Sequence, residues 1–207
     1  QHEEHIRQFL STYEGTPLAR KLRSKWLSYL AKRKRKALFL EFYRPTRSAS
    51  LRCTYLQYEI ENGKSITEAK DAIAELWTVG KSQPKQCDPI FRKWIKAGYL
   101  SEDLVLQRIQ KAADGGRHTL IPYLRTLLPK NKQYLADLWH KTRRDPSTVK
   151  RVNSFLNKYP LIEADIMSYG LSRLIWRDQD LAIKTFLDAE QRMVFTKAQR
   201  ARIFSQF

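Results

Sequence analysis

Signals that start and end helices recur along this chain at short distances, and they constrain its fold more than any other feature. Ser, Thr and Asp side chains cap the free amides of a first helical turn, and glycine or proline commonly follows a helix end. Typical capping residues stand at Thr16, Ser65, Asp88, Ser101, Asp178 and Thr196. Ser65 opens a capping box, in which its hydroxyl accepts from the Glu68 amide and the Glu68 carboxylate accepts from the Ser65 amide.

The segments between these signals are amphipathic with a helical period. Leu18, Leu22, Trp26 and Leu30 recur at every fourth position and predict one buried stripe. Further helices are expected over residues 36–43, 49–61, 65–80, 88–98, 101–115, 118–128, 131–143, 147–158, 161–176, 179–192 and 197–206. No long run alternates with period two. Short connections between such helices predict an all-α fold of stacked antiparallel helix pairs, an α-solenoid or superhelix, although no repeat consensus recurs.

Charge is the strongest compositional signal. The 207 residues include 39 Lys and Arg against 21 Asp and Glu, which gives a net charge of +18. Such an excess attracts polyanions, and charge alone does not choose between DNA, RNA, an anionic membrane surface and an acidic polysaccharide. No apolar run is long enough to predict a membrane span, and the first residues, QHEEHIRQFL, lack the pattern of a signal peptide.

Two basic clusters are candidate contacts for a polyanion. The first is the run Lys32, Arg33, Lys34, Arg35 and Lys36, and the second is the pair Arg143 and Arg144. Either cluster can contact phosphates or carboxylates, and the first also resembles a nuclear localisation signal. Both clusters can also be solvated helix ends, because cations are favourable at a helix C-terminus. We prefer this interpretation, since charge runs usually form solvated faces.

Motifs for metal binding and for nucleophilic catalysis are missing from the sequence. His2 and His5 are spaced by three residues instead of the four of a zincin helix, while His118 and His140 lack neighbouring ligand residues. There is no Gly-x-Ser-x-Gly, no histidine close to either cysteine, and no Gly-Lys-Ser/Thr after paired glycines. We therefore expect no metal and no cofactor.

Carboxylates and tryptophans are interpreted as structural. Capping explains the acidic residues at helix starts, and others stand on mixed-charge faces, so none is expected to be a catalytic acid. The first group is Glu68, Asp88, Glu102 and Asp103, and the second is Glu163, Asp188 and Glu190. A sugar-stacking role is conceivable for the tryptophans, but core packing is expected for Trp26, Trp77, Trp94, Trp139 and Trp176.

Cys53 and Cys87 are the only cysteines, and they stand on successive helical segments. Antiparallel neighbours can bring them within bonding distance, and a bridge over such a long loop stabilises a fold by about 3 to 4 kcal/mol. In a reducing compartment they would be two buried thiols. Spacing alone leaves both states open.

The passage ELWTVGKSQPKQCDPIFRKW, preceded by LRCTYLQYEIENG, resembles the soluble lytic murein transglycosylases of Gram-negative bacteria. Their superhelical part carries a similar ELW-x-x-GKSQP-x-x-CD-x-x-F passage after an earlier cysteine. The resemblance is strongest from Leu51 to Trp94 and extends loosely through LQRIQKAADGG to the LLP at 127–129. It implies a periplasmic protein, which favours a disulfide between Cys53 and Cys87.

The resemblance also implies that catalysis belongs to a domain separate from the superhelical part. In that family a separate C-terminal lysozyme-like domain cleaves peptidoglycan with one glutamate and leaves a 1,6-anhydro sugar. That glutamate stands in a Glu-Ser motif, followed by Gly-Leu-Met-Gln and Ala-Tyr-Asn-Ala-Gly, and this chain contains none of the three. Residues 1–207 are therefore expected to be a single superhelical domain, trimmed at both ends and without the catalytic domain.

The function expected from this resemblance is noncatalytic. The domain would guide or retain peptidoglycan strands for the catalytic domain, since stem-peptide carboxylates complement the positive charge. The alternative is a basic helical-repeat scaffold that binds nucleic acid or an acidic protein. Nucleic-acid affinity that falls steeply with salt and survives an excess of peptidoglycan fragments would distinguish the alternative.

Overall fold

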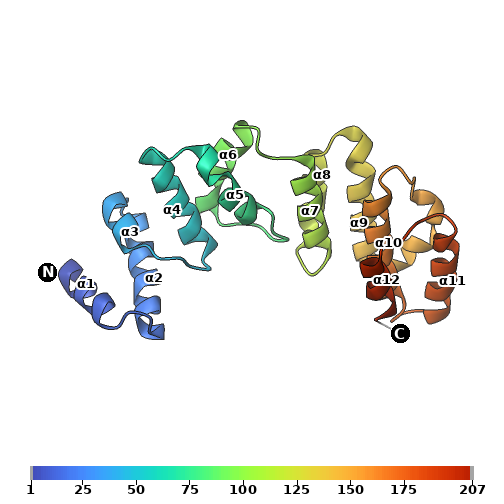
Figure 1. The fold of residues 1–207 in the computed structure, drawn as a ribbon, viewed down its shortest axis with the longest axis horizontal. Coiled ribbons are helices and arrows are strands. Elements are labelled where there is room, and N and C mark those ends of the chain that lie inside the picture. Colours follow the sequence, from blue (N-terminus) through green and yellow to red (C-terminus); the bar gives the residue numbers. More distant parts are fainter. Residues whose placement is uncertain (1, 206–207) are drawn as a thin grey trace. The chain divides into compact units, whose positions relative to one another are not determined.

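The computed structural model describes residues 2–205, and these residues form α-helices, short 3-10 helices and loops without a β-strand (Figure 1). The α-helices are α1 (His2–Thr12), α2 (Pro17–Lys32), α3 (Lys36–Phe42), α4 (Ala49–Glu61), α5 (Ile66–Trp77), α6 (Asp88–Lys96), α7 (Glu102–Ala113), α8 (Ile121–Thr126), α9 (Gln133–Arg144), α10 (Pro160–Leu174), α11 (Gln179–Glu190) and α12 (Lys197–Phe204). The 3-10 helices are η1 (Lys85–Cys87), η2 (His118–Leu120), η3 (Lys130–Lys132), η4 (Pro146–Lys150) and η5 (Val152–Ser154). None of the helices in this described part is long and apolar enough to cross a membrane. The predicted all-α class is confirmed.

The chain divides into two compact units. The first contains the residues up to Trp77 together with Gln83–Leu100, and the second contains Thr78–Ser82 and the residues from Ser101 onward. Within each unit, helices that follow one another in sequence pack against one another, as α4 does on α5 and α9 does on α10. Contacts between neighbours are the organising feature of a solenoid. That residues 1–207 act as one domain of a longer protein stays a prediction.

One hydrophobic cluster of the first unit joins α2, α3 and the start of α4. It includes Leu27, Leu30, Phe39 and Leu51. The predicted stripe of α2 is partly wrong, because Leu18 is 62% exposed whereas Ala19 is buried. Steps of four residues drift around a helix that has 3.6 residues per turn, so four such positions do not stay on one face.

A disulfide joins Cys53 of α4 to Cys87 of η1, across 34 positions of sequence. Both cysteines are fully buried. The bridge therefore holds the turn before α6 against α4 within the first unit. Asp88 is not the helix cap that the sequence predicts, because η1 runs directly into α6 and Asp88 is already helical.

Only one of the two hydrogen bonds of the predicted capping box forms before α5. The Ser65 amide donates to the Glu68 carboxylate at 3.0 Å, as predicted. The Ser65 hydroxyl instead accepts from the Thr67 amide at 3.1 Å. The start of α5 is still capped from both side chains.

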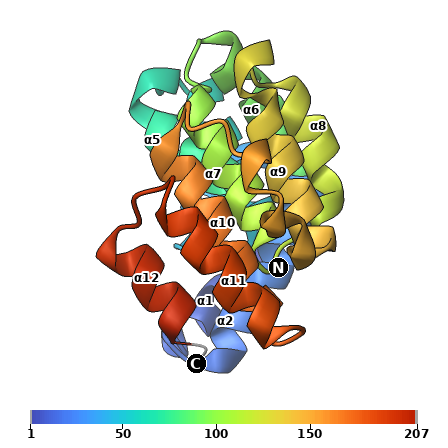
Figure 2. The same cartoon turned by 90° about the vertical axis from the view of Figure 1, so that its right-hand side faces the viewer.

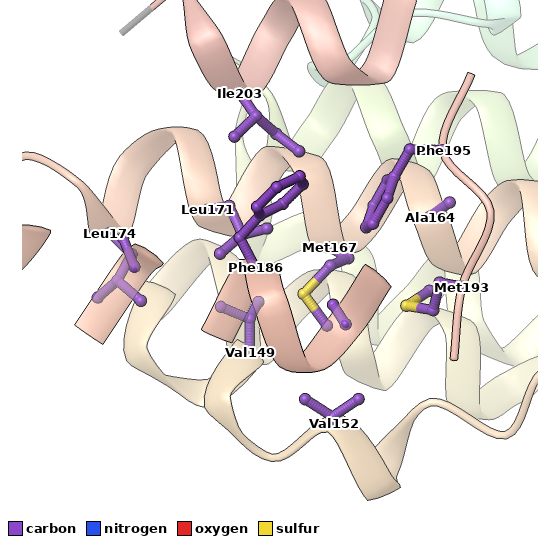
Figure 3. Close-up of a cluster of buried hydrophobic side chains, with 12 residues drawn as sticks. Val149, Val152, Ala164, Met167, Leu171, Leu174, Phe186, Met193, Phe195 and Ile203 are labelled. Carbon is purple, nitrogen blue, oxygen red and sulfur yellow. The ribbon is translucent and has the colours of Figure 1, made fainter. Parts of the chain in front are cut away.

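One hydrophobic cluster of the second unit is built by α10, α11 and α12 together with η4 and η5. Phe186 of α11 lies between Met167 of α10 and Ile203 of α12 (Figure 3). The rings of Phe186 and Phe195 have their centroids 5.8 Å apart. Helix α12 packs beside α10, as two perpendicular views of this unit show (Figures 1 and 2).

The helix expected over residues 147–158 is wrong. The segment forms η4 and η5, and Asn157 adopts a left-handed φ of 53°. Val149 of η4 and Val152 of η5 are both buried, and both belong to the hydrophobic cluster that α10 and α11 also form. Two apolar residues three positions apart also fit one face of an α-helix, so the sequence pattern predicted an α-helix here.

Trp176 also contradicts its prediction. Trp77, Trp94 and Trp139 are buried and Trp26 is half-buried, but Trp176 is 74% exposed. It follows the end of α10, where the chain turns toward α11. Core packing therefore does not explain this side chain.

Candidate ligand-binding surface

The basic run from Lys32 to Lys36 forms the whole turn between α2 and α3. Helix α2 ends at Lys32, and α3 begins at Lys36. Lys34 adopts a left-handed φ of 55°, and the Arg35 amide donates to the Leu30 carbonyl at 2.9 Å, which caps α2. Residues 32–35 are exposed, as the solvated-end interpretation expects.

Lys36 differs from the rest of the run because it is half-buried at the start of α3. A cation is unfavourable near a helix N-terminus. Its ammonium compensates by pairing with the Glu61 carboxylate at 2.6 Å and lying 5.7 Å from the centre of the Tyr58 ring. Hydrogen bonds from Lys36 and then Gln57 lower the pKa of Glu61 below its usual range.

Three lysines of the run line a cavity of about 860 Å³ in the first unit. These lysines are Lys32, Lys34 and Lys36. The lining also includes a polar stripe of α4, whose members are spaced so that one helix face presents them all: Ser50, Thr54, Gln57 and Glu61. We call this hollow the lysine cavity.

The lysine cavity offers both charge and hydrogen-bonding groups. Gln57 donates to Glu61 at 2.6 Å, and its Oε1 is buried without a hydrogen-bond partner among residues 2–205. Lysine ammoniums only donate, whereas a free amide oxygen only accepts. The cavity is therefore equipped for a ligand that carries carboxylates together with hydroxyl or amide donors.

A second basic cavity, of about 730 Å³, lies in the same unit and was not foreseen from the sequence. Four arginines from α2 and from the connection between α3 and α4 line it: Arg20, Arg23, Arg44 and Arg47. Arg23 is held by the Glu14 carboxylate at 2.6 Å, and Arg44 donates to the Tyr43 carbonyl at 2.7 Å. These arginines come from two separate segments of the chain. No local sequence pattern therefore predicts that folding brings them together around one cavity.

Arg143 and Arg144 stand at the end of α9 in the second unit, as the helix-end interpretation expects. Arg144 is exposed and Arg143 is half-buried. Arg143 lines a small cavity, whereas Arg144 is not among its lining residues. The two predicted basic clusters thus belong to different units.

Glu163, one of the carboxylates weighed for catalysis, has a structural role. Glu163 is fully buried and accepts four hydrogen bonds, so it does not stand on a mixed-charge surface as expected. His118 and His140 approach each other at 3.4 Å. Within residues 2–205 no group of three or more His, Cys, Asp or Glu side chains is arranged to hold a metal ion.

The sequence and the helical fold are similar to those of known proteins. No protein-family model matches the chain. The soluble lytic murein transglycosylase of Escherichia coli K12 is 30% identical over 146 residues, which is 70% of this chain. That of Salmonella typhimurium shares the same identity over the same length. This chain is homologous to the soluble lytic murein transglycosylases.

Solved structures of lytic transglycosylases match over nearly the whole chain. An inactive mutant of the lytic transglycosylase Slt from Pseudomonas aeruginosa is 27% identical with a TM-score of 0.79 over 98% of this chain. The 70-kDa soluble lytic transglycosylase of Escherichia coli, at 23% identity and a TM-score of 0.76, shares the fold over 100% of it. The α-solenoid class predicted from the sequence is thus confirmed.

The homology covers only part of these larger proteins. The chain spans 22% of the length of the Escherichia coli relative and 33% of each solved lytic transglycosylase chain. The predicted resemblance is confirmed.

Proposed function

We propose that this chain is a noncatalytic helical module of a periplasmic lytic transglycosylase, and that it retains peptidoglycan strands for a separate catalytic domain. The observation that carries the proposal is the homology to murein transglycosylases over 70% of the chain. The lysine cavity supplies a matching surface, since peptidoglycan combines carboxylates with sugar hydroxyls and amides. The Cys53–Cys87 disulfide agrees with an oxidising compartment such as the periplasm.

Binding to purified peptidoglycan sacculi tests the retaining role. We expect the 207-residue chain to sediment with sacculi, and Lys32→Glu/Lys34→Glu to weaken this binding by about tenfold, since each charge reversal replaces an attraction by a repulsion. Lys184→Glu/Lys197→Glu is the matched control. It changes the net charge equally, and both positions are exposed in the second unit outside the lining of the lysine cavity.

Two outcomes would overturn this role. Equal losses in both double variants would mean that sacculi respond to total charge and not to the lysine cavity. Duplex DNA that binds as tightly as sacculi, and displaces them, would favour the nucleic-acid scaffold instead.

The noncatalytic part needs a separate assay. Sacculi incubated with this chain alone should release no soluble 1,6-anhydro sugar fragments, as chromatography of the supernatant would show. Addition of an active lytic transglycosylase is the positive control. Release by this chain alone would contradict the proposal.

A further inference from the structure

The small cavity beside Arg143 in the second unit has a composition that the lysine cavity lacks. It has a volume of about 380 Å³ and lies where the ends of α7 and α9 meet α10 and α12. Arginines and aromatic rings from these helices line it: Arg143, Arg173, Arg202, Tyr169 and Trp176, with Asp114 as an acidic member. We call it the arginine–tryptophan cavity.

Tyr169 organises the positive charge of this cavity. Its hydroxyl donates to the Ala113 carbonyl at 3.0 Å, and the side chain is buried. The guanidinium carbons of Arg173 and Arg202 lie 5.4 Å and 5.1 Å from the centre of its ring. Cation–π contact holds both arginines beside the cavity without neutralising them.

The remaining partners of these arginines compensate only one charge. Arg173 donates to the Arg143 carbonyl at 2.8 Å, which fixes its position but supplies no negative charge. Arg202 pairs with Asp114 at 2.8 Å. Three guanidinium groups therefore face one carboxylate among the lining residues, which leaves an excess positive charge.

Arg143 contributes an independent sign that a polar ligand fits here. Its Nε is buried and has no hydrogen-bond partner among residues 2–205. A buried donor left without a partner destabilises the fold, so such a group normally meets an acceptor. Arg143 lines the cavity, so a carboxylate oxygen placed there is an acceptor within reach of its guanidinium group.

Trp176 supplies an apolar surface next to this charge. The indole is 74% exposed although it is one of the largest apolar side chains. Flat aromatic rings bind the apolar faces of other rings, and indoles are typical anchors in binding sites. A ligand that suits both features carries a carboxylate attached to a ring with one apolar face.

We infer that the arginine–tryptophan cavity binds a carboxylate-bearing sugar unit, with the carboxylate at Arg143 and Arg173, whose charges no carboxylate within residues 2–205 compensates, and the sugar ring against Trp176. This inference rests on the proposed function, because peptidoglycan carries its carboxylates on sugar-linked groups. It adds a specific subsite in the second unit to the general retention by the lysine cavity.

The test uses the whole chain and a purified disaccharide-tetrapeptide fragment of peptidoglycan, with binding measured by calorimetry. We expect Trp176→Ala and Arg143→Gln each to weaken binding by about tenfold, because each removes one of the two anchors. Arg143→Lys keeps the charge but lacks the Nε donor, so it should recover part of the affinity. Tyr123→Ala and Arg151→Gln are matched controls at exposed positions that do not line the cavity.

Chemically altered probes separate the two parts of the inference. The same fragment with its carboxylates amidated should bind weakly, and uncharged chitotetraose should bind more weakly than the intact fragment. Equal binding of the amidated fragment would overturn the carboxylate contact. Circular dichroism and thermal unfolding of each variant would show that a loss is not caused by misfolding.

The failure of this inference differs from a failure of the proposed function. If sacculi bind through the lysine cavity but Trp176→Ala and Arg143→Gln leave the fragment affinity unchanged, the proposed subsite is wrong. The proposed retention of peptidoglycan by the helical module then still stands. If the chain binds neither sacculi nor the fragment, both are wrong. If the controls lose as much affinity as the cavity variants, the subsite is also wrong.

Discussion

The hydroxyl of Tyr134 on α9 donates to the carboxylate of Glu163 on α10 at 2.6 Å. The amides of Asn157, Lys158 and Tyr159 donate to the same carboxylate at 2.8 Å, 3.0 Å and 3.3 Å. Glu163 is 0% exposed, so these four donors replace the water that the charge would otherwise need. One carboxylate thus joins α9, the loop before α10 and the first turn of α10. Burial, and then the same hydrogen bond to Glu163, raise the pKa of the Tyr134 phenol well above its usual range.

Glu163→Gln should destabilise the second unit by about 2 to 3 kcal/mol, because a glutamine NH2 group would face amide donors that need an acceptor. Urea unfolding followed by circular dichroism measures this loss. Tyr134→Phe removes only one of the four donors and should cost about 1 kcal/mol. A Glu163→Gln chain as stable as the parent would contradict the structural role of this carboxylate.

Removal of the disulfide should weaken the first unit. Cys53→Ala/Cys87→Ala opens a loop of 34 positions, and the chain-entropy model gives a loss of about 4 kcal/mol. Thermal unfolding with and without reductant provides the measurement. Reductant should lower the melting temperature of the parent and leave that of the double variant unchanged. Insensitivity of the parent, with full reduction shown by thiol titration, would refute the stabilising role.

The second unit should lose stability on mild acidification because of His140. Burial, followed by the positive charges of His118 and Arg144, lowers the pKa of this imidazole below its ordinary value, although Asp137 opposes the shift. The unfolded chain therefore binds the proton more readily, and the stability present above about pH 6.5 is lost as the pH falls through the lower folded pKa.

Unfolding free energies measured between about pH 7.5 and 5 check the sign of this effect. His140→Gln should give a flatter dependence than the parent. His118→Gln should also flatten it, because removal of the neighbouring charge allows the pKa of His140 to rise. A parent chain that becomes more stable on acidification over this range, with both variants unchanged, would contradict the assignment.

Gly170 is required by close packing inside α10. A Cβ at this position would lie 2.2 Å from Val149 Cγ1 and 2.7 Å from Thr142 Cγ2. Alanine favours a helix over glycine by about 1 kcal/mol, but overpacking costs about 1 to 3 kcal/mol, so Gly170→Ala should be net destabilising.

A double-mutant cycle isolates this collision. Val149→Ala removes the nearest methyl groups and should itself be destabilising through lost burial, while the double variant should be more stable than the sum of the two single effects predicts. Chemical unfolding of the four chains gives the coupling. Strictly additive losses would show that Val149 does not restrict position 170.

The sequence alone determined the helical class. Helix caps such as Ser101 and Thr196 act on amides only a few residues away, and the connections between helices are short. Both side chains cap the helices that follow them. It also showed the resemblance around Cys53 and Cys87, because the motif is continuous in the chain. Local hydrogen bonds and backbone preferences need no knowledge of distant partners.

Only the tertiary structure decided which side chains face a common space. Val149 and Val152 suit an α-helix as well as the 3-10 helices observed, and packing against α10 and α11 chose between them. Likewise, Trp176 has an apolar side chain but lies exposed beside arginines from α9, α10 and α12. Such arrangements depend on groups that are far apart in sequence. Burial and hydrogen bonding bring these groups together only in the folded chain, so local patterns could not predict them.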